Sequence, residues 1–152
     1  METTVFEQVK IQAQVLIPLL RAFQAELGEE RANEIARKAL RSYRHKLGQE
    51  IRSQLKGNSM EKIVAFASMT SAGGALDVEV LKQTPDAFEF NVTGCRYAQF
   101  YKKLDALDLG FLCVCEADIH IAESFIPDVE FTRTQTIMQG ASHCDFRYQM
   151  KK

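Results

Sequence analysis

The side chains best suited to chemistry gather near the C-terminal end, in the stretch RTQTIMQGASHCDFRY at residues 133–148. It holds two arginines, a histidine, a cysteine and an aspartate around a Gly-Ala pair. Arginine can bind a carboxylate through two parallel hydrogen bonds, and the other three types act as nucleophiles or as general acids and bases. A solvated hairpin also carries polar residues, so this stretch alone fits either a surface or the wall of an active site.

Two strands are expected here, over residues 129–138 and 143–150, with a turn between them. Neighbouring side chains of a strand point to opposite faces, so at most one of His143 and Cys144 can line a site. The two are therefore a poor nucleophile–base pair. Strand geometry favours other groups: Cys144 with Cys115 or Cys95, and His143 with Asp145 and Arg147.

Cys95 lies in the run NVTGCRY, at the expected junction of a strand and a helix. Unpaired N–H groups and the helix dipole at such a position lower the pKa of a cysteine. Cys95 is therefore a candidate thiolate nucleophile, or the helix start could bind an anion. The structural alternative is a small, half-buried residue with Thr93 as the helix cap.

Cys115 and Asp118 are expected on one face of a helix, because residues three apart are neighbours there. Asp118 interrupts an apolar stretch, and a carboxylate packed against a sheet is costly unless it is paired. Arg133 and Arg147 are the expected partners. Ion pairing alone would explain Asp118 as well as catalysis would.

Composition is typical of a soluble globular protein, with 46% hydrophobic and 26% charged residues. The net charge of −1 argues against a general attraction to nucleic acid or anionic lipid. The longest apolar run, residues 15–20, is interrupted by Pro18 and is too short to span a membrane. The N-terminal METTVFEQVK lacks the features of a signal peptide. We therefore expect a cytoplasmic protein with neither a nucleic-acid partner nor a membrane contact.

The four cysteines, Cys95, Cys113, Cys115 and Cys144, contain no CxxC pair and lack the spacing of a zinc site. A chain of 152 residues can bury a core without disulfides. We expect reduced cysteines and neither a metal nor another cofactor. Metal dependence stays open, because the chain has Cys, His and Asp side chains that could serve as ligands.

The elements that must position these residues divide one domain, residues 1–152, into a helical half (1–72) and a sheet-containing half (73–152). Apolar periodicity predicts the elements in this order: helices from Thr3 or Thr4 to Leu27, 29–55 and 59–70, strands 75–83 and 87–93, helices 96–104 and 108–125, and strands 129–138 and 143–150. This order predicts an α+β fold with an antiparallel sheet of about four strands, covered by helices on one face.

Two features of the helical half leave alternatives open. Pro18 should kink or split the first helix, and Gly48 is a possible interruption of the second. The charged side of the second helix is interpreted as a solvated face. The amphipathic N-terminal helices could pair between subunits of a homo-oligomer, but packing within one chain explains them equally well.

Three motifs together, NVTGCRYAQFYKKL, DLGFLCVCEAD and FTRTQTIMQGASHCDFRY, resemble the bacterial L-2-amino-thiazoline-4-carboxylic acid hydrolase family. The shared pattern is a Cys-Arg-Tyr helix start, a Cys-x-x-Asp helix and an Arg-Thr-x-Thr…Gly…Cys-Asp-Phe-Arg hairpin. The resemblance covers roughly residues 86–148. At Gly94 the family more often has a basic or polar residue.

The resemblance implies hydrolytic opening of a ring at a carbon–nitrogen bond other than a peptide bond. In the reaction that names the family, the 2-aminothiazoline ring is hydrated to N-carbamoyl-cysteine. The expected partner is therefore a small substrate that bears a carboxylate. The expected catalytic residues are Cys95, Cys115, Asp118 and Cys144, and the expected substrate-binding residues are Arg96, Tyr97, Arg133, Thr134, Asp145 and Arg147.

Two mechanisms and a second function remain compatible with these residues. Cys144 or Cys95 could attack as a thiolate while His143 or Asp118 moves protons, or Asp118 could activate water directly and the cysteines only shape the pocket. The alternative function is a sensing module for a small molecule or a thiol, which binds a carboxylate ligand in the same pocket without turnover.

Overall fold

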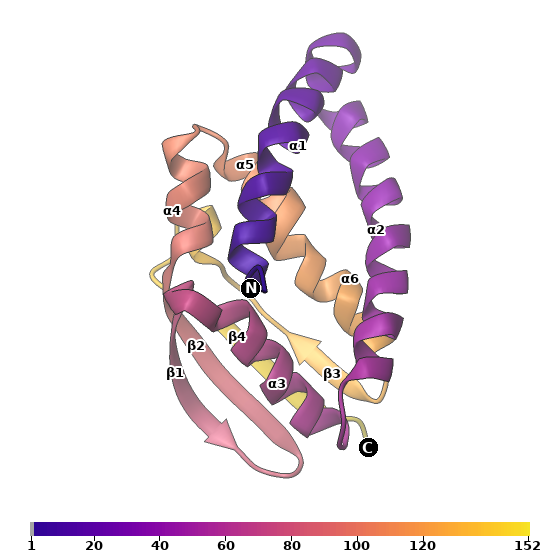
Figure 1. Cartoon of the computed structure of the whole chain (residues 1–152), viewed down its shortest axis with the longest axis vertical. Helices are drawn as coiled ribbons and strands as arrows, with labels where there is room; N and C mark the ends of the chain where they lie inside the picture. The colour runs from indigo at the N-terminus through magenta and orange to yellow at the C-terminus, as the bar shows by residue number, and fades with distance from the viewer. Residues whose placement is uncertain (1) are drawn as a thin grey trace.

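The order of helices and strands confirms the predicted α+β class, in a computed structural model that describes residues 2–152 (Figure 1). The elements are α1 (Val5–Leu27), α2 (Glu29–Gln54), α3 (Ser59–Ser71), β1 (Leu76–Gln83), β2 (Ala87–Cys95), α4 (Arg96–Lys103), α5 (Leu107–Gly110), α6 (Glu116–Phe125), β3 (Val129–Thr132) and β4 (Cys144–Met150). A π-helical segment, Phe111–Cys115, joins α5 to α6, and short 3₁₀ turns lie at Ala72–Gly74 and Ile137–Gln139.

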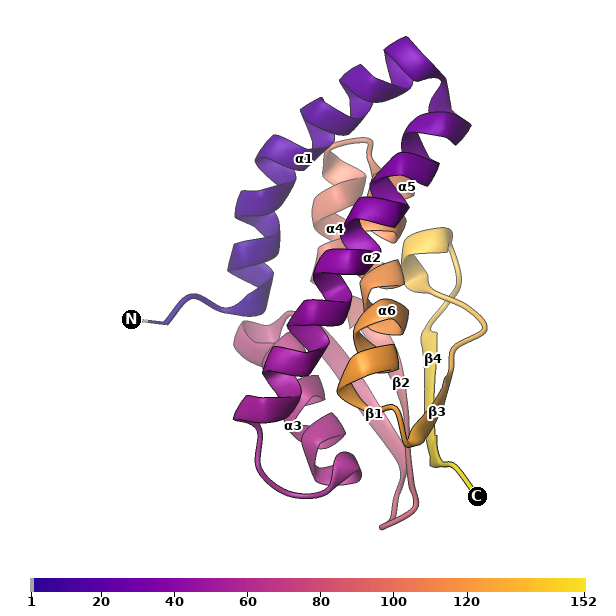
Figure 2. The same ribbon diagram turned by 90° about the vertical axis from the view of Figure 1, so that its right-hand side faces the viewer.

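The four strands form one antiparallel sheet in the order β1-β2-β4-β3. Alternation along β2 buries Phe88, Phe90 and Val92, while the residues between them point the other way. Val92 is paired with Cys144 on β4, so Cys144 lies on the same face. Figure 2 shows the helices packed on one side of the sheet, as expected. We call the face they cover the inner face.

Helix α1 begins with a capping box, in which Thr4 and Glu7 satisfy each other's backbone N–H groups. It runs unbroken through Pro18, because both Ala13 before it and Leu20 after it are buried in one core cluster. Pro18 therefore does not split the helix. A second apolar stripe on α1 is exposed to between 45 and 66%: Ile11, Val15, Leu19, Phe23 and Leu27.

Helix α2 is also continuous, so Gly48 does not interrupt it. Gly48 instead permits close contact with α6, since a Cβ atom there would collide with Ser124 Oγ and lie 2.6 Å from the carbonyl oxygen of Ile121. Ser124 Oγ donates a 2.7 Å hydrogen bond to the carbonyl oxygen of His45, which joins the same two helices.

The predicted strand 129–138 is wrong beyond Thr132, where β3 ends. The chain leaves the sheet there because the Asp145 carboxylate accepts hydrogen bonds from the N–H groups of Thr134 (2.8 Å) and Gln135 (2.9 Å). These bonds take the place of strand pairing. The predicted helix 108–125 is likewise three pieces, α5, the π-helical segment and α6.

Candidate functional site

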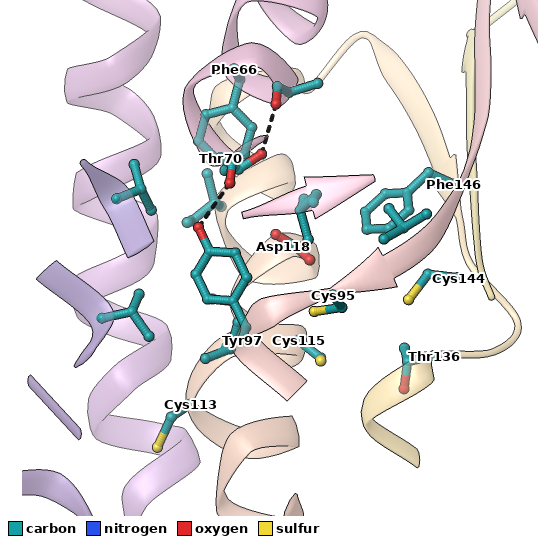
Figure 3. Close-up of a pocket in the computed structure, with 18 of the residues that line it drawn as sticks. Phe66, Thr70, Cys95, Tyr97, Cys113, Cys115, Asp118, Thr136, Cys144 and Phe146 are labelled. Carbon is teal, nitrogen blue, oxygen red and sulfur yellow. Dashed lines mark hydrogen bonds between the residues drawn. The ribbon is translucent and has the colours of Figure 1, made fainter. Parts of the chain in front are cut away.

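A cavity of about 280 Å³ lies between the helices and the inner face of the sheet. Most of its lining is apolar and comes from α1, α2, α3, β2 and β4. The lining residues that could do chemistry are Arg44, Cys95, Tyr97, Cys113, Cys115, Asp118, Arg133, Thr136 and Cys144. Figure 3 shows Asp118 and the thiols of Cys95, Cys115 and Cys144 on this lining. Residues far apart in the sequence thus meet at one site.

Asp118 is paired with Arg133, which confirms one of its two predicted partners. Arg133 Nη1 donates to Asp118 Oδ2 at 2.9 Å, and Nη2 donates to the carbonyl oxygen of Cys115 at 2.9 Å. The side chain of Arg133 is only 4% exposed. Its guanidinium lies 5.4 Å from the ring centroid of Phe146, within range of a cation–π contact. The charge of Arg133 is thus compensated by Asp118, and its guanidinium is held by protein groups.

The Asp118 carboxyl is an acid–base group with a pKa near neutrality. Burial raises the pKa of Asp118 to about 6, although the positive charges of Arg133 and Arg44 act in the opposite direction. At pH 7 the carboxylate form predominates, and below pH 6 the protonated form does. A group of this kind can accept or return a proton under physiological conditions.

All four cysteines line the cavity as free thiols. Cys95 is the N-cap of α4, where its Sγ accepts a hydrogen bond from the N–H of Ala98 at 3.4 Å. Thr93 is therefore not the helix cap. The expectation that the helix start lowers the pKa of Cys95 is wrong: burial raises this pKa, and the bond from Ala98 offsets only part of the effect.

Burial also raises the pKa of the three other thiols, Cys113, Cys115 and Cys144. Cys144 Sγ accepts a hydrogen bond from the N–H of Ile137 at 3.2 Å. The cysteines are close enough that negative charge on Cys144 would further raise the pKa of Cys95 and Cys115. The thiols are therefore neutral at physiological pH.

Tyr97 lines the cavity through its ring. Its hydroxyl donates to the carbonyl oxygen of Thr70 at 2.9 Å (Figure 3), and its ring meets Phe6 edge to face with centroids 4.9 Å apart. Burial raises the pKa of Tyr97 far above its usual range. Tyr97 thus connects α4 to α1 and α3 around the cavity and stays un-ionised.

Arg44 is a cavity residue that the sequence interpretation missed, because it counted the charged side of α2 as solvated. Arg44 is 4% exposed, and its Nη2 donates to the carbonyl oxygens of Leu112 (2.8 Å) and Cys113 (3.0 Å) in the π-helical segment. The signal was present in the spacing: Arg44 lies four residues after Leu40 and three before Leu47, on the apolar side of the helix.

Thr136 was also missed. It is 2% exposed, lines the cavity and caps the turn Ile137–Gln139 by accepting a hydrogen bond from the N–H of Gln139 at 3.2 Å. Threonine is common in solvated strands, and the predicted strand 129–138 gave no reason to treat this one differently. No local pattern would have identified it.

Four predicted substrate-binding residues, Arg96, Thr134, Asp145 and Arg147, lie outside the cavity lining. Arg96 forms a partly exposed ion pair with Asp77 at 3.5 Å. Asp145 holds the loop at Thr134, as described above, and Arg147 bonds to Asn91 Oδ1 at 3.0 Å on the face of the sheet opposite the cavity. Arg147 is therefore not a partner of Asp118.

His143 also lies outside the cavity lining and has Ser142 Oγ at 2.8 Å from its Nδ1. Strand parity predicted that at most one of His143 and Cys144 lines the site, and the cavity lining includes Cys144 alone of the two. Within residues 2–152, no three His, Cys, Asp or Glu side chains are placed to share one metal ion. None of the helices described for these residues is long and apolar enough to cross a bilayer.

Comparison with known proteins extends the resemblance seen in the motifs. The family described as L-2-amino-thiazoline-4-carboxylic acid hydrolase matches residues 8–148, nearly the whole chain. Among solved structures, the phenol-responsive sensory domain of the transcription activator PoxR with phenol is similar, with a TM-score of 0.51 and 13% sequence identity. The similarity covers 90% of this chain and 73% of that chain, and at this identity it shows a shared fold alone. No curated protein matches the chain in sequence.

Proposed function

Because this chain belongs to the L-2-amino-thiazoline-4-carboxylic acid hydrolase family, we propose that it hydrolyses a small cyclic amidine bearing a carboxylate within the cavity described above. The observation that carries the proposal is the Asp118–Arg133 pair in a mainly apolar wall, with a carboxyl pKa of about 6. A half-buried carboxylate of this kind can take a proton from an attacking water molecule.

Water rather than a thiolate is the proposed nucleophile. Burial raises the pKa of each cavity thiol, so each would first have to lose a proton to a base. No histidine of residues 2–152 is part of the cavity lining. Asp118 is the carboxylate available there. It is better placed to take a proton from water than from a cavity thiol, because deprotonation of the thiol would leave a thiolate anion beside it. The cysteines then shape the pocket.

The atom balance of the name-giving reaction decides which bond breaks. Water adds its oxygen to C2 of the ring, and Asp118 takes one of its protons; the other proton passes to the ring nitrogen as the oxygen on C2 becomes a carbonyl. Cleavage of the C2–S bond, with return of that proton to sulfur, gives N-carbamoyl-cysteine with a free thiol. Cleavage of the ring C2–N bond gives the isomeric S-carbamoyl-cysteine with a free amine. The expected carbon–nitrogen cleavage therefore corresponds to the second product, and N-carbamoyl-cysteine requires carbon–sulfur cleavage.

The test is incubation of the purified full chain with 2-aminothiazoline-4-carboxylate, followed by removal of the protein and mass spectrometry. We expect a product heavier than the substrate by one water. A thiol reagent then separates the isomers, since only N-carbamoyl-cysteine reacts. Heat-unfolded protein is the control. Equal amounts of hydrated product with native and unfolded protein would remove this substrate from the proposal.

The second candidate is binding without turnover. The mainly apolar lining and the neutral thiols favour it, because they suit retention of a ligand more than its chemical activation. The two functions differ in one observable. A binding module gains thermal stability with the thiazoline acid and releases the same acid unchanged, while a hydrolase releases the hydrated product.

A further inference from the structure

Among residues 2–152, three charged side chains line the cavity, and two of them neutralise each other. Asp118 and Arg133 form an ion pair at 2.9 Å. Arg44 is the third, and within residues 2–152 it has no carboxylate oxygen within 4.0 Å of its guanidinium nitrogens. At neutral pH the lining therefore carries one uncompensated positive charge.

The hydrogen bonds of Arg44 leave donors free. A guanidinium has five N–H groups. Two of those on Arg44 reach the carbonyl oxygens of Leu112 and Cys113, and Nη1 lies 3.3 Å from His120 Nδ1. The Nε–H has no acceptor among the described residues. No fully buried side-chain nitrogen of this part of the chain lacks a partner, so Nε borders space that a water or ligand atom can reach.

Burial of a cation without a counter-charge is unfavourable. Burial accordingly lowers the pKa of Arg44, although a guanidinium remains protonated at physiological pH. A carboxylate brought in by a ligand would supply the missing charge and accept hydrogen bonds from the free donors. The carbonyl oxygens of Leu112 and Cys113 already hold the guanidinium in place, so little side-chain freedom remains to be lost on binding.

Arg133 and Arg147, two of the arginines expected to bind substrate, are unsuited to hold its carboxylate. Arg133 is already engaged by Asp118 and by the carbonyl oxygen of Cys115. Arg147 lies on the opposite face of the sheet and bonds to Asn91. We infer that Arg44 binds the carboxylate of the ligand and that the cavity selects small monoanions over their neutral counterparts. The ligand class rests on the proposed function, but the charge argument holds with or without turnover.

The test measures binding by calorimetry with the full chain and two pairs of probes: 2-aminothiazoline-4-carboxylate with its carboxamide, and benzoate with benzamide. In the native protein we expect at least one carboxylate to bind about tenfold or more tightly than its amide. Arg44→Met should reduce that ratio to about one. Arg44→Lys, which keeps the charge but not the fork of donors, should give an intermediate ratio.

Arg41→Gln is the matched control, because Arg41 lies on the same helix in an exposed ion pair with Glu123. It should leave the ratio unchanged. The ratio is measured within each variant, so a general loss of stability does not imitate the effect. If Arg44→Met does not fold, the acid-to-amide binding ratios of the native protein and of Arg44→Lys decide whether the inference holds.

Equal binding of acid and amide by the native protein, no binding of either acid, or an unchanged ratio in the Arg44 variants would overturn the inference. The two proposals fail separately. A preference for benzoate that depends on Arg44, with no hydration of the thiazoline acid, contradicts the hydrolase and leaves the inference standing. Turnover of the thiazoline acid without a preference for carboxylates over amides contradicts the inference and leaves the hydrolase proposal standing.

Discussion

At the scale of single residues, Asp118 is held between two opposing effects. Burial favours its protonated form, and the guanidinium of Arg133 favours its carboxylate. Burial prevails, so the pKa of Asp118 in the folded protein, about 6, lies above the usual value of 3.8 for an aspartate. The folded state therefore binds more protons than the unfolded state between these two pH values.

This difference predicts how stability changes with pH. The contribution of Asp118 to the unfolding free energy should fall as pH rises from about 4 to about 6, by at most about 3 kcal/mol. Asp118→Asn has no carboxyl to titrate and should lack this change. Urea unfolding at pH 4, 5 and 7 measures both proteins. A difference between native and variant that stays constant over this range would show that the folded pKa of Asp118 is not raised.

At the scale of elements, the contact between α2 and α6 positions both the Arg44 side and the Asp118 side of the cavity. Gly48 allows this contact, since a methyl group would meet Ser124 Oγ and the backbone of Ile121. Arg44 donates hydrogen bonds to two carbonyl oxygens of the π-helical segment, and Arg133 donates to a third. A π-helical segment commonly marks a functional site.

Gly48→Ala tests this contact through the sign of the change in the unfolding free energy. Helix propensity alone would make alanine stabilising by about 1 kcal/mol. The collision with α6 should instead make the variant less stable, by about 1–3 kcal/mol. Urea unfolding measures the change, and Gln49→Ala, at an exposed position one residue later, serves as the control. A stabilised Gly48→Ala variant would mean that the helices do not approach this closely.

The sequence predicted most helices and strands, because their types depend on patterns among residues that are neighbours in the chain. The capped starts at Thr4 and Asn58 and the alternation along β2 fix element types without knowledge of the fold. The end of β3 was missed because it depends on Asp145, a residue from another strand. Alternation along a single strand was enough to predict that at most one of His143 and Cys144 lines the site, because it requires no knowledge of the rest of the fold.

At the scale of the whole molecule, the site forms from segments that the tertiary fold brings together, and the sequence identified only part of it. Cys95, Cys115, Asp118 and Cys144 were found by type and motif, and the fold places all four on one cavity. Their protonation could not be predicted, because burial by distant helices outweighs the helix start at Cys95. The spacing placed Arg44 on the apolar side of α2, but its contact with the π-helical segment depends on the packing of α2 against that segment and α6.

The central claim is that Asp118 activates water in this cavity, and the pH dependence of kcat/KM for the thiazoline acid tests it most directly. In the native protein we expect the rate to fall as pH drops through about 6, where the carboxylate becomes protonated. Asp118→Asn should lose roughly 100-fold or more of the rate at pH 7, whereas Glu123→Gln, on the surface of the same helix, should keep it. Retention of native turnover by Asp118→Asn, with the same pH profile, would contradict the claim.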